Sequence, residues 1–209
     1  MVLLVAPSRR ALPAVTVPAR MRTLILRGHY SAVEDQIRAA LNRGGVDLIV
    51  SLGFAAAVDR RLAVGDLLLA TRIFGGADVY LDLPPLQAPG AVRGSLCSLM
   101  HGRAPGPLRG RRRLPPVYAF DDHGFWLARA AQTARVPCLL LRSVLLEAPS
   151  EGQPPDPLLS DFLGGRLGRA LVKQPGRWRE LAGLLRATDL CRSHLASALA
   201  VLLVLHGQA

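Results

Sequence analysis

Two turns built from small residues follow apolar runs and are the first candidates for chemistry in this chain. Gly53 and Ala55 come directly after an apolar run of strand length, and Gly28 follows another such run, between Arg27 and His29. Small side chains at these points let backbone amides approach a ligand closely. The second turn also precedes a helical segment, and glycine turns at helix N-termini suit anions. Both turns are therefore candidate ligand contacts.

Acidic and imidazole side chains lie near the ends of two further elements. Phe120, Asp121 and His123 precede a helical segment, and Glu147 follows an apolar run. A carboxylate can transfer a proton in catalysis, and a histidine can bond a ligand hydroxyl. The histidines show no metal-binding pairing, and the cysteines show no metal-ligand spacing. We therefore expect no metal and no cofactor.

Three other patterns are weaker signals. Ser51 follows a strand, but no Gly-x-Ser-x-Gly elbow surrounds it. The glycines within 164–168 lack the Gly-Lys-Ser/Thr of a phosphate loop and indicate a helix break. The arginines within 109–113 lie between prolines and glycines without an interleaved aromatic platform. We expect a mobile surface loop there and no nucleic-acid site.

Apolar runs and helical periodicity predict the elements that would position these residues. Continuous apolar character is typical of strands that are covered on both faces. We expect five such strands in one sheet: Val2 to Ala6, Thr23 to Leu26, Leu48 to Leu52, Asp66 to Ala70 and Cys138 to Val144. Helices are expected at 31–43, 124–133, 158–171 and 178–205, the first of them between two strands, as in a parallel sheet. Residues 74–116 are rich in Gly, Pro and Arg, and we expect long loops there with one short strand.

Length and composition favour a single domain over residues 1–209. A chain of 209 residues can bury a core without disulfides or metals. The net charge of +11 comes almost wholly from arginine, which favours an anionic partner, but no nucleic-acid motif accompanies it. The widely spaced cysteines fit a cytoplasmic protein. The apolar segments 1–6 and 195–205 are too short for a signal peptide and a membrane span, although peripheral membrane contact by the second stays open.

The stretch around Gly53 resembles the nucleoside phosphorylase and nucleosidase superfamily. In that family a buried strand ends in a turn of the type Gly-x-Ala-Gly-Gly, and a Gly-Asp-Leu sequence opens the next strand. Here Gly53 and Ala55 match, Ala56 and Ala57 replace glycines, and Val64-Gly65-Asp66-Leu67 follows. In such a turn the small residues would admit a ribose or a base.

A second match covers residues 118–144 and resembles the family's Ala-Val-Asp-Met-Glu-Ser segment with the helix and strand after it. Asp121 is retained, while His123 replaces the glutamate that grips the ribose hydroxyls. The family's Ser-Asp at the strand end, whose aspartate protonates or orients the departing purine, aligns so that Leu146 replaces the aspartate. Glu147, one residue further on, is then the candidate proton donor.

The resemblance is closest to the hopanoid-associated phosphorylases, and it implies a three-layer α/β sandwich with a mixed central sheet and helices on both faces. It implies cleavage of the N-glycosidic bond of a purine nucleoside by phosphate or water, an adenosyl-lipid such as adenosylhopane as a candidate substrate, and a homo-oligomer. The implied catalytic residues are Asp121 and Glu147, the substrate contacts Gly28, His29, Gly53, Ala55, Phe120 and His123, and the phosphate contact Arg27. The alternative is a catalytically degenerate member that binds a nucleoside or a protein partner.

Overall fold

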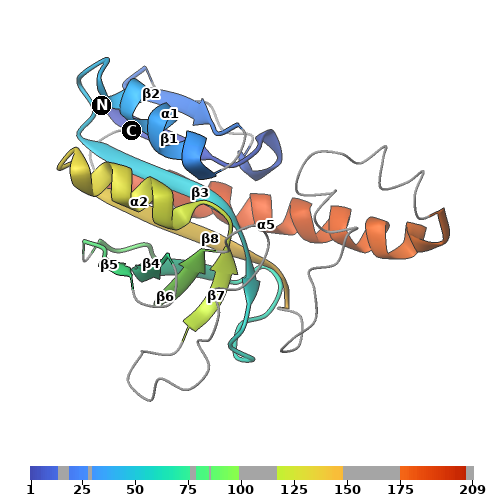
Figure 1. Cartoon of the computed structure of the whole chain (residues 1–209). Coiled ribbons are helices and arrows are strands. Elements are labelled where there is room, and N and C mark those ends of the chain that lie inside the picture. The colour runs from blue at the N-terminus through green and yellow to red at the C-terminus, as the bar shows by residue number, and fades with distance from the viewer. Residues whose placement is uncertain are drawn as a thin grey trace.

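The described residues form one eight-stranded mixed sheet with helices packed on it (Figure 1). The computed structural model describes residues 1–13, 19–27, 30–75, 79–84, 86–98, 117–147 and 175–205. The strands are β1 Val2–Ala6, β2 Met21–Ile25, β3 Leu48–Ala57, β4 Leu67–Phe74, β5 Tyr80–Asp82, β6 Val92–Ser98, β7 Val117–Asp121 and β8 Cys138–Glu147. The α-helices are α1 Tyr30–Leu41, α2 Gly124–Thr133 and α5 Trp178–Leu205, and the short 3₁₀ helices are η1 Arg9–Ala11 and η2 Pro175–Arg177.

The sheet closes on itself over part of its width. β2, β1, β3 and β8 lie side by side in that order and are parallel to one another, as expected for strands joined by crossover helices, whereas β7 on β3 and β4 on β8 are antiparallel. β3, β8, β4, β6 and β7 form a closed ring, because each pairs with the next and β7 pairs back onto β3. Closure brings β6 and β7 beside the carboxyl end of β3.

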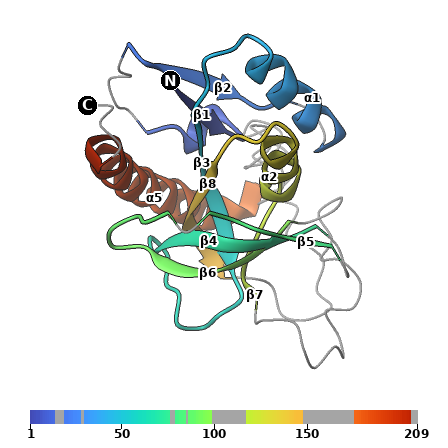
Figure 2. The ribbon, with the colours of Figure 1, turned by 90° about the vertical axis from the view of Figure 1, so that its left-hand side faces the viewer.

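Apolar side chains cover both faces of this sheet. Val33 and Ile37 of α1 and Phe125 of α2 pack with Leu140 in one core cluster. On the other face, α5 buries leucines against the opposite side of the same strands. Figure 2 shows α1 and α2 on one side of β3 and β8, and α5 on the other. The predicted three-layer arrangement is confirmed, and all five predicted strands lie in the one sheet.

The structure corrects two of the predicted elements. The described part of the middle segment, residues 79–84 and 86–98, holds the strands β5 and β6, where one short strand was expected in the whole segment. β3 does not end at Leu52 but continues to Ala57, because the small residues that looked like a turn let the strand pair with both β7 and β8. The segments 28–29, 109–113 and 158–171, to which predictions were also attached, lie outside the described residues.

The long C-terminal helix α5 combines two properties. Its length and mean hydropathy of 1.4 would suit a membrane span. Yet Leu195, Leu199 and Leu202 are almost completely buried against the sheet, in a cluster with Leu141. The expectation of a core-packing helix over this segment is therefore confirmed.

Candidate functional site

Asp121, at the end of β7, is the centre of a buried hydrogen-bond network. One carboxylate oxygen accepts a hydrogen bond from the Ser98 hydroxyl at 2.6 Å, and the other accepts one from Arg142 Nε at 2.9 Å. The backbone N–H of Gly124 lies 3.2–3.3 Å from both oxygens. The Ser98 hydroxyl oxygen in turn accepts the backbone N–H of Phe125 at 2.8 Å. The network therefore ties the end of β7 to the start of α2 and the end of β6.

Arg142 carries the positive charge of this network, and one of its terminal nitrogens is also bonded. That nitrogen donates to the carbonyl oxygen of Ser51 at 3.0 Å, to its hydroxyl at 3.2 Å and to the carbonyl oxygen of Leu141 at 3.1 Å. The Arg142 and Asp121 side chains are only 3% and 2% exposed. Buried charges are tolerated when they are paired and hydrogen-bonded, and this pair has both kinds of contact. Asp121 thus holds the site together, and its carboxylate has little capacity left for a substrate.

Gly53 belongs to the same network for a steric reason. It lies inside β3 opposite Arg142 of β8, and a Cβ at this position would meet the Arg142 side chain at 3.3 Å. The glycine therefore leaves room for the guanidinium group to cross β3 towards Ser51 and Asp121. The sequence singled out Gly53 as a ligand contact, whereas the structure shows it against a buried arginine.

Replacing Gly53 by alanine is expected to lower the free energy of unfolding by about 1 kcal/mol, because the added methyl displaces Arg142 from its partners. The same change at Gly183, an exposed position in α5 with nothing within 4 Å of an added Cβ, should instead stabilise the protein by up to about 1 kcal/mol. Urea unfolding of both variants measures the difference. Equal effects would show that Arg142 does not need the space above Gly53.

His123 differs from its neighbours because part of its side chain lacks a partner. It occupies the N-cap of α2, and its backbone carbonyl oxygen accepts the N–H of Leu127. Its Nδ1 atom is buried, and within the described ranges it has no hydrogen-bond partner. Buried polar atoms are nearly always paired, so an orphaned one needs an explanation, such as a missing ligand.

The end of β8 is apolar at the position where the family resemblance places an aspartate. The pairing of β8 with β3 shifts register there, so that Leu145 is passed over and Leu146 lies opposite Ala56. Leu145 and Leu146 pack in a cluster with Leu181 and Cys191 of α5. Glu147 is the last residue of β8, opposite Ala57.

The other predicted contacts fall into two groups. Phe120 is half-buried in β7 opposite Ala56, and Ala55 is buried in β3 opposite Val144, so both lie beside the network. Arg27 lies after β2, exposed, with its backbone N–H and carbonyl oxygen both bonded to the Gln36 side chain. β2 is three strand positions from β7, or about 14 Å. The structure therefore brings Gly53, Ala55, Phe120, Asp121 and His123 together and leaves Arg27 apart.

Sequence reasoning missed the partners of Asp121. Ser98 lies in the irregular middle segment, and Arg142 lies inside an apolar run that was read only as a strand. A charged residue within such a run was the available signal, because an arginine buried in a sheet requires a carboxylate nearby. Cys97, next to Ser98, is also buried, and that burial, with Asp121 adding a smaller effect, raises the pKa of its thiol to about 12. The thiol is therefore neutral and unreactive near neutral pH.

This combination of a partly closed mixed sheet and helices on both faces is a fold that the chain shares with solved structures of nucleosidases. Three solved structures that this chain matches are nucleosidases: two 5'-methylthioadenosine/S-adenosylhomocysteine nucleosidases and one S-adenosylhomocysteine nucleosidase. The Helicobacter pylori protein shares 12% identity and a TM-score of 0.61, over 95% of this chain and 97% of that chain. The Colwellia psychrerythraea protein, in complex with adenine, shares 15% identity and a TM-score of 0.58, over 94% and 95%. The Streptococcus pyogenes protein shares 14% identity and a TM-score of 0.57, over 85% and 96%.

The TM-scores and the shares of the chains covered show a common fold, and they show the fold alone. No family model matches the sequence, and no curated protein gives a significant match. The resemblance to hopanoid-associated phosphorylases stays a prediction.

Proposed function

We propose that this protein binds a purine nucleoside where β3, β7 and β8 end, with His123 as the ribose contact. The observation that carries the proposal is the buried, unpartnered Nδ1 of His123. It lies at the chain position that aligns with the ribose-gripping glutamate of the superfamily, on a fold shared with adenosine-type nucleosidases. An imidazole nitrogen can bond one ribose hydroxyl, although it cannot accept two hydrogen bonds as a carboxylate does.

The reaction proposed for the bound nucleoside is cleavage of its N-glycosidic bond by water or phosphate, with Glu147 as proton donor to the departing base. Asp121 is better suited to position the start of α2, since its oxygens are already bonded to Ser98, Arg142 and Gly124. An adenosyl-lipid is one candidate substrate. The apolar end of β8, with Leu146 in place of the acid, favours a second candidate function, in which the protein binds a nucleoside without cleaving it.

Binding of adenosine and 5'-methylthioadenosine by isothermal titration calorimetry tests the shared part of both proposals. Changing His123 to alanine should weaken binding about tenfold, because a buried hydrogen bond to the ribose is lost. Gln132→Ala, an exposed position at the other end of the same helix, is the matched control and should bind like the wild type. Equal affinities in the two variants would remove His123 from the site, and no binding by the wild type would remove the nucleoside proposal.

A further inference from the structure

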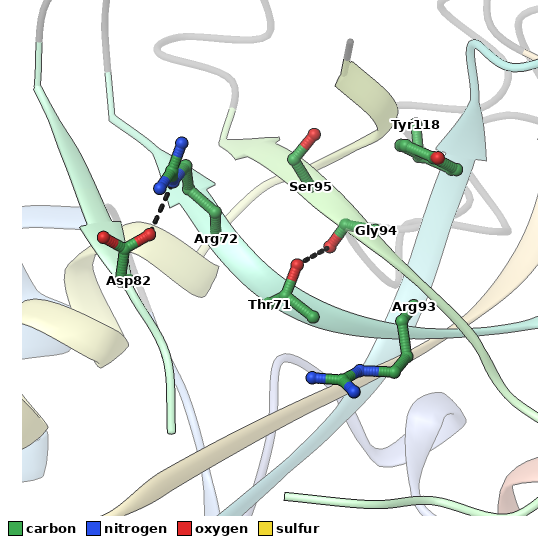
Figure 3. A pocket seen from close by; sticks show the side chains of 7 residues that line it. All are labelled: Thr71, Arg72, Asp82, Arg93, Gly94, Ser95 and Tyr118. Atoms are coloured by element: carbon green, nitrogen blue, oxygen red, sulfur yellow. Dashed lines mark hydrogen bonds and ion pairs between the residues drawn. The ribbon is translucent and has the colours of Figure 1, made fainter. Parts of the chain in front are cut away.

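A second site lies on the outer side of β4, β6 and β7, away from the network around Asp121. A pocket of about 340 Å³ is lined there by Thr71, Arg72, Asp82, Arg93, Gly94, Ser95 and Tyr118 (Figure 3). Ser95 is three residues before Ser98 along β6, a distance of about 10 Å. A volume of this size suits a small metabolite.

Two irregularities in strand pairing shape this pocket. Thr71 is passed over in the pairing of β4 with β6, and Tyr118 is passed over in the pairing of β6 with β7. Both pairs are parallel, where bulges are rare. Both bulges flank the same part of β6, Gly94 and Ser95. Bulges re-aim side chains and are frequent next to functional sites, and here they turn a hydroxyl and an aromatic ring towards one pocket.

Gly94 is required by the aromatic wall of the pocket. A Cβ at Gly94 would lie 2.6 Å from the ring of Tyr118, closer than real atoms approach. The ring therefore lies directly against the backbone of β6. The Thr71 hydroxyl donates to the carbonyl oxygen of Gly94 at 3.3 Å, so the opposite wall is also tied to this residue. The backbone of β6 at Gly94 therefore forms the base of the pocket, and the Tyr118 ring forms one side of it.

The charges of the lining favour an anion. Arg72 Nε donates to Asp82 at 2.5 Å, and its guanidinium group lies 4.6 Å from the centre of the Tyr80 ring. Arg93 is exposed and forms no ion pair within the described part of the chain. Two guanidinium groups and one carboxylate therefore leave one positive charge in excess. In Figure 3 the two arginines lie on opposite sides of Thr71, so an anion beside Thr71 has a donor on each side.

We propose that this pocket binds a small molecule with a phosphate or carboxylate group, held by Arg93 and the free donors of Arg72. Guanidinium forks match the geometry of both oxyanions. The uncharged part of the ligand packs against the ring of Tyr118. This site is independent of the proposed nucleoside site, because it shares no residue with it.

Calorimetric titration of the full chain with ribose 5-phosphate, benzoate and uncharged ribose, at one ionic strength, tests the proposal. At least one of the two anions should bind, and ribose should not. The anion that binds shows whether the ligand carries phosphate or carboxylate. Absence of binding by both anions, or equal binding of ribose, overturns the proposal.

Two substitutions at the pocket should act in opposite directions. Arg93→Ala should weaken anion binding about fivefold, since one partly exposed charge contact is lost. Asp82→Asn should strengthen it about threefold, because the competing carboxylate on Arg72 is neutralised. Arg22→Ala, an exposed arginine on β2 outside the pocket, and His123→Ala should leave it unchanged. If neither Arg93→Ala nor Asp82→Asn changes the anion affinity, the assignment of the pocket is contradicted. A general loss of folding would weaken binding in both variants and cannot produce changes of opposite sign.

Discussion

Replacing Arg142 by methionine is expected to lower the free energy of unfolding by about 3–5 kcal/mol. The change leaves the Asp121 carboxylate with Ser98 and Gly124 as its hydrogen-bond partners and without a counter-charge. A carboxylate buried without an opposite charge is strongly destabilising, whereas the intact pair is close to neutral relative to apolar residues. The loss should be visible as a lower urea midpoint with an unchanged dependence on urea concentration.

The matched control is Arg61→Met, which removes another arginine paired with an aspartate. Arg61 lies 2.6 Å from Asp59, but its side chain is 76% exposed. Ion pairs in contact with water contribute little to stability, so this variant should unfold nearly like the wild type. A loss at Arg142 no larger than that at Arg61 would contradict the structural role given to the buried pair. The double variant Arg142→Met with Asp121→Asn should lose less than the sum of the two single variants, because no unpaired charge remains.

The fold was predictable because its signals are local. Continuous apolar runs marked β1, β2, β3, β4 and β8, and helical spacing of apolar residues marked α1, α2 and α5. The extension of β3 to Ala57 was not predictable from one segment, because small residues such as Ala56 are compatible with both a turn and a strand. The small residues extend the strand because β7 and β8, from distant parts of the sequence, pair with β3 at these positions.

The site was predictable only in part for the same reason. Gly53, Asp121 and His123 do lie near one another, but Gly53 lies inside β3 and not at the strand end where the sequence placed it. What each residue contacts depended on Ser98 and Arg142, which approach from other strands. The spacing of residues along the chain does not indicate that the Asp121 carboxylate already has three hydrogen-bond partners. Nor does it indicate that a Cβ added at Gly53 would meet the Arg142 side chain. The pocket between Arg72 and Arg93 likewise depends on two pairing irregularities that leave no mark in the sequence.

If the wild-type chain lacks a proton donor, restoring the superfamily pattern is expected to raise the rate of nucleoside cleavage by about 10²- to 10⁴-fold, the usual contribution of a positioned proton donor. The variant combines Leu146→Asp with His123→Glu. Position 146 lies against an apolar cluster that includes Leu181 and Cys191. Partial removal from water there should raise the pKa of the new carboxyl group, which keeps it protonated and able to donate. Leu184→Asp with His123→Glu is the control, because Leu184 packs on the same cluster from α5 but is not at a strand end.

The wild-type chain separates the two remaining possibilities for the proton donor. If Glu147 donates, Glu147→Gln should reduce cleavage by a similar 10²- to 10⁴-fold while nucleoside affinity is retained, because the amide cannot transfer a proton. Adenine release would be followed with adenosine, 5'-methylthioadenosine and an adenosyl-lipid mimic, each with and without phosphate. Brisk cleavage that is unaffected by Glu147→Gln would contradict the assignment of the donor.

Slow cleavage by the wild type, with a gain in the Leu146→Asp variant and none in the Leu184→Asp control, would instead favour a protein that binds nucleosides after losing its acid. A large gain from the carboxyl group at position 146 therefore indicates a wild-type chain without a proton donor, and no gain together with a loss in Glu147→Gln indicates that Glu147 already supplies the proton.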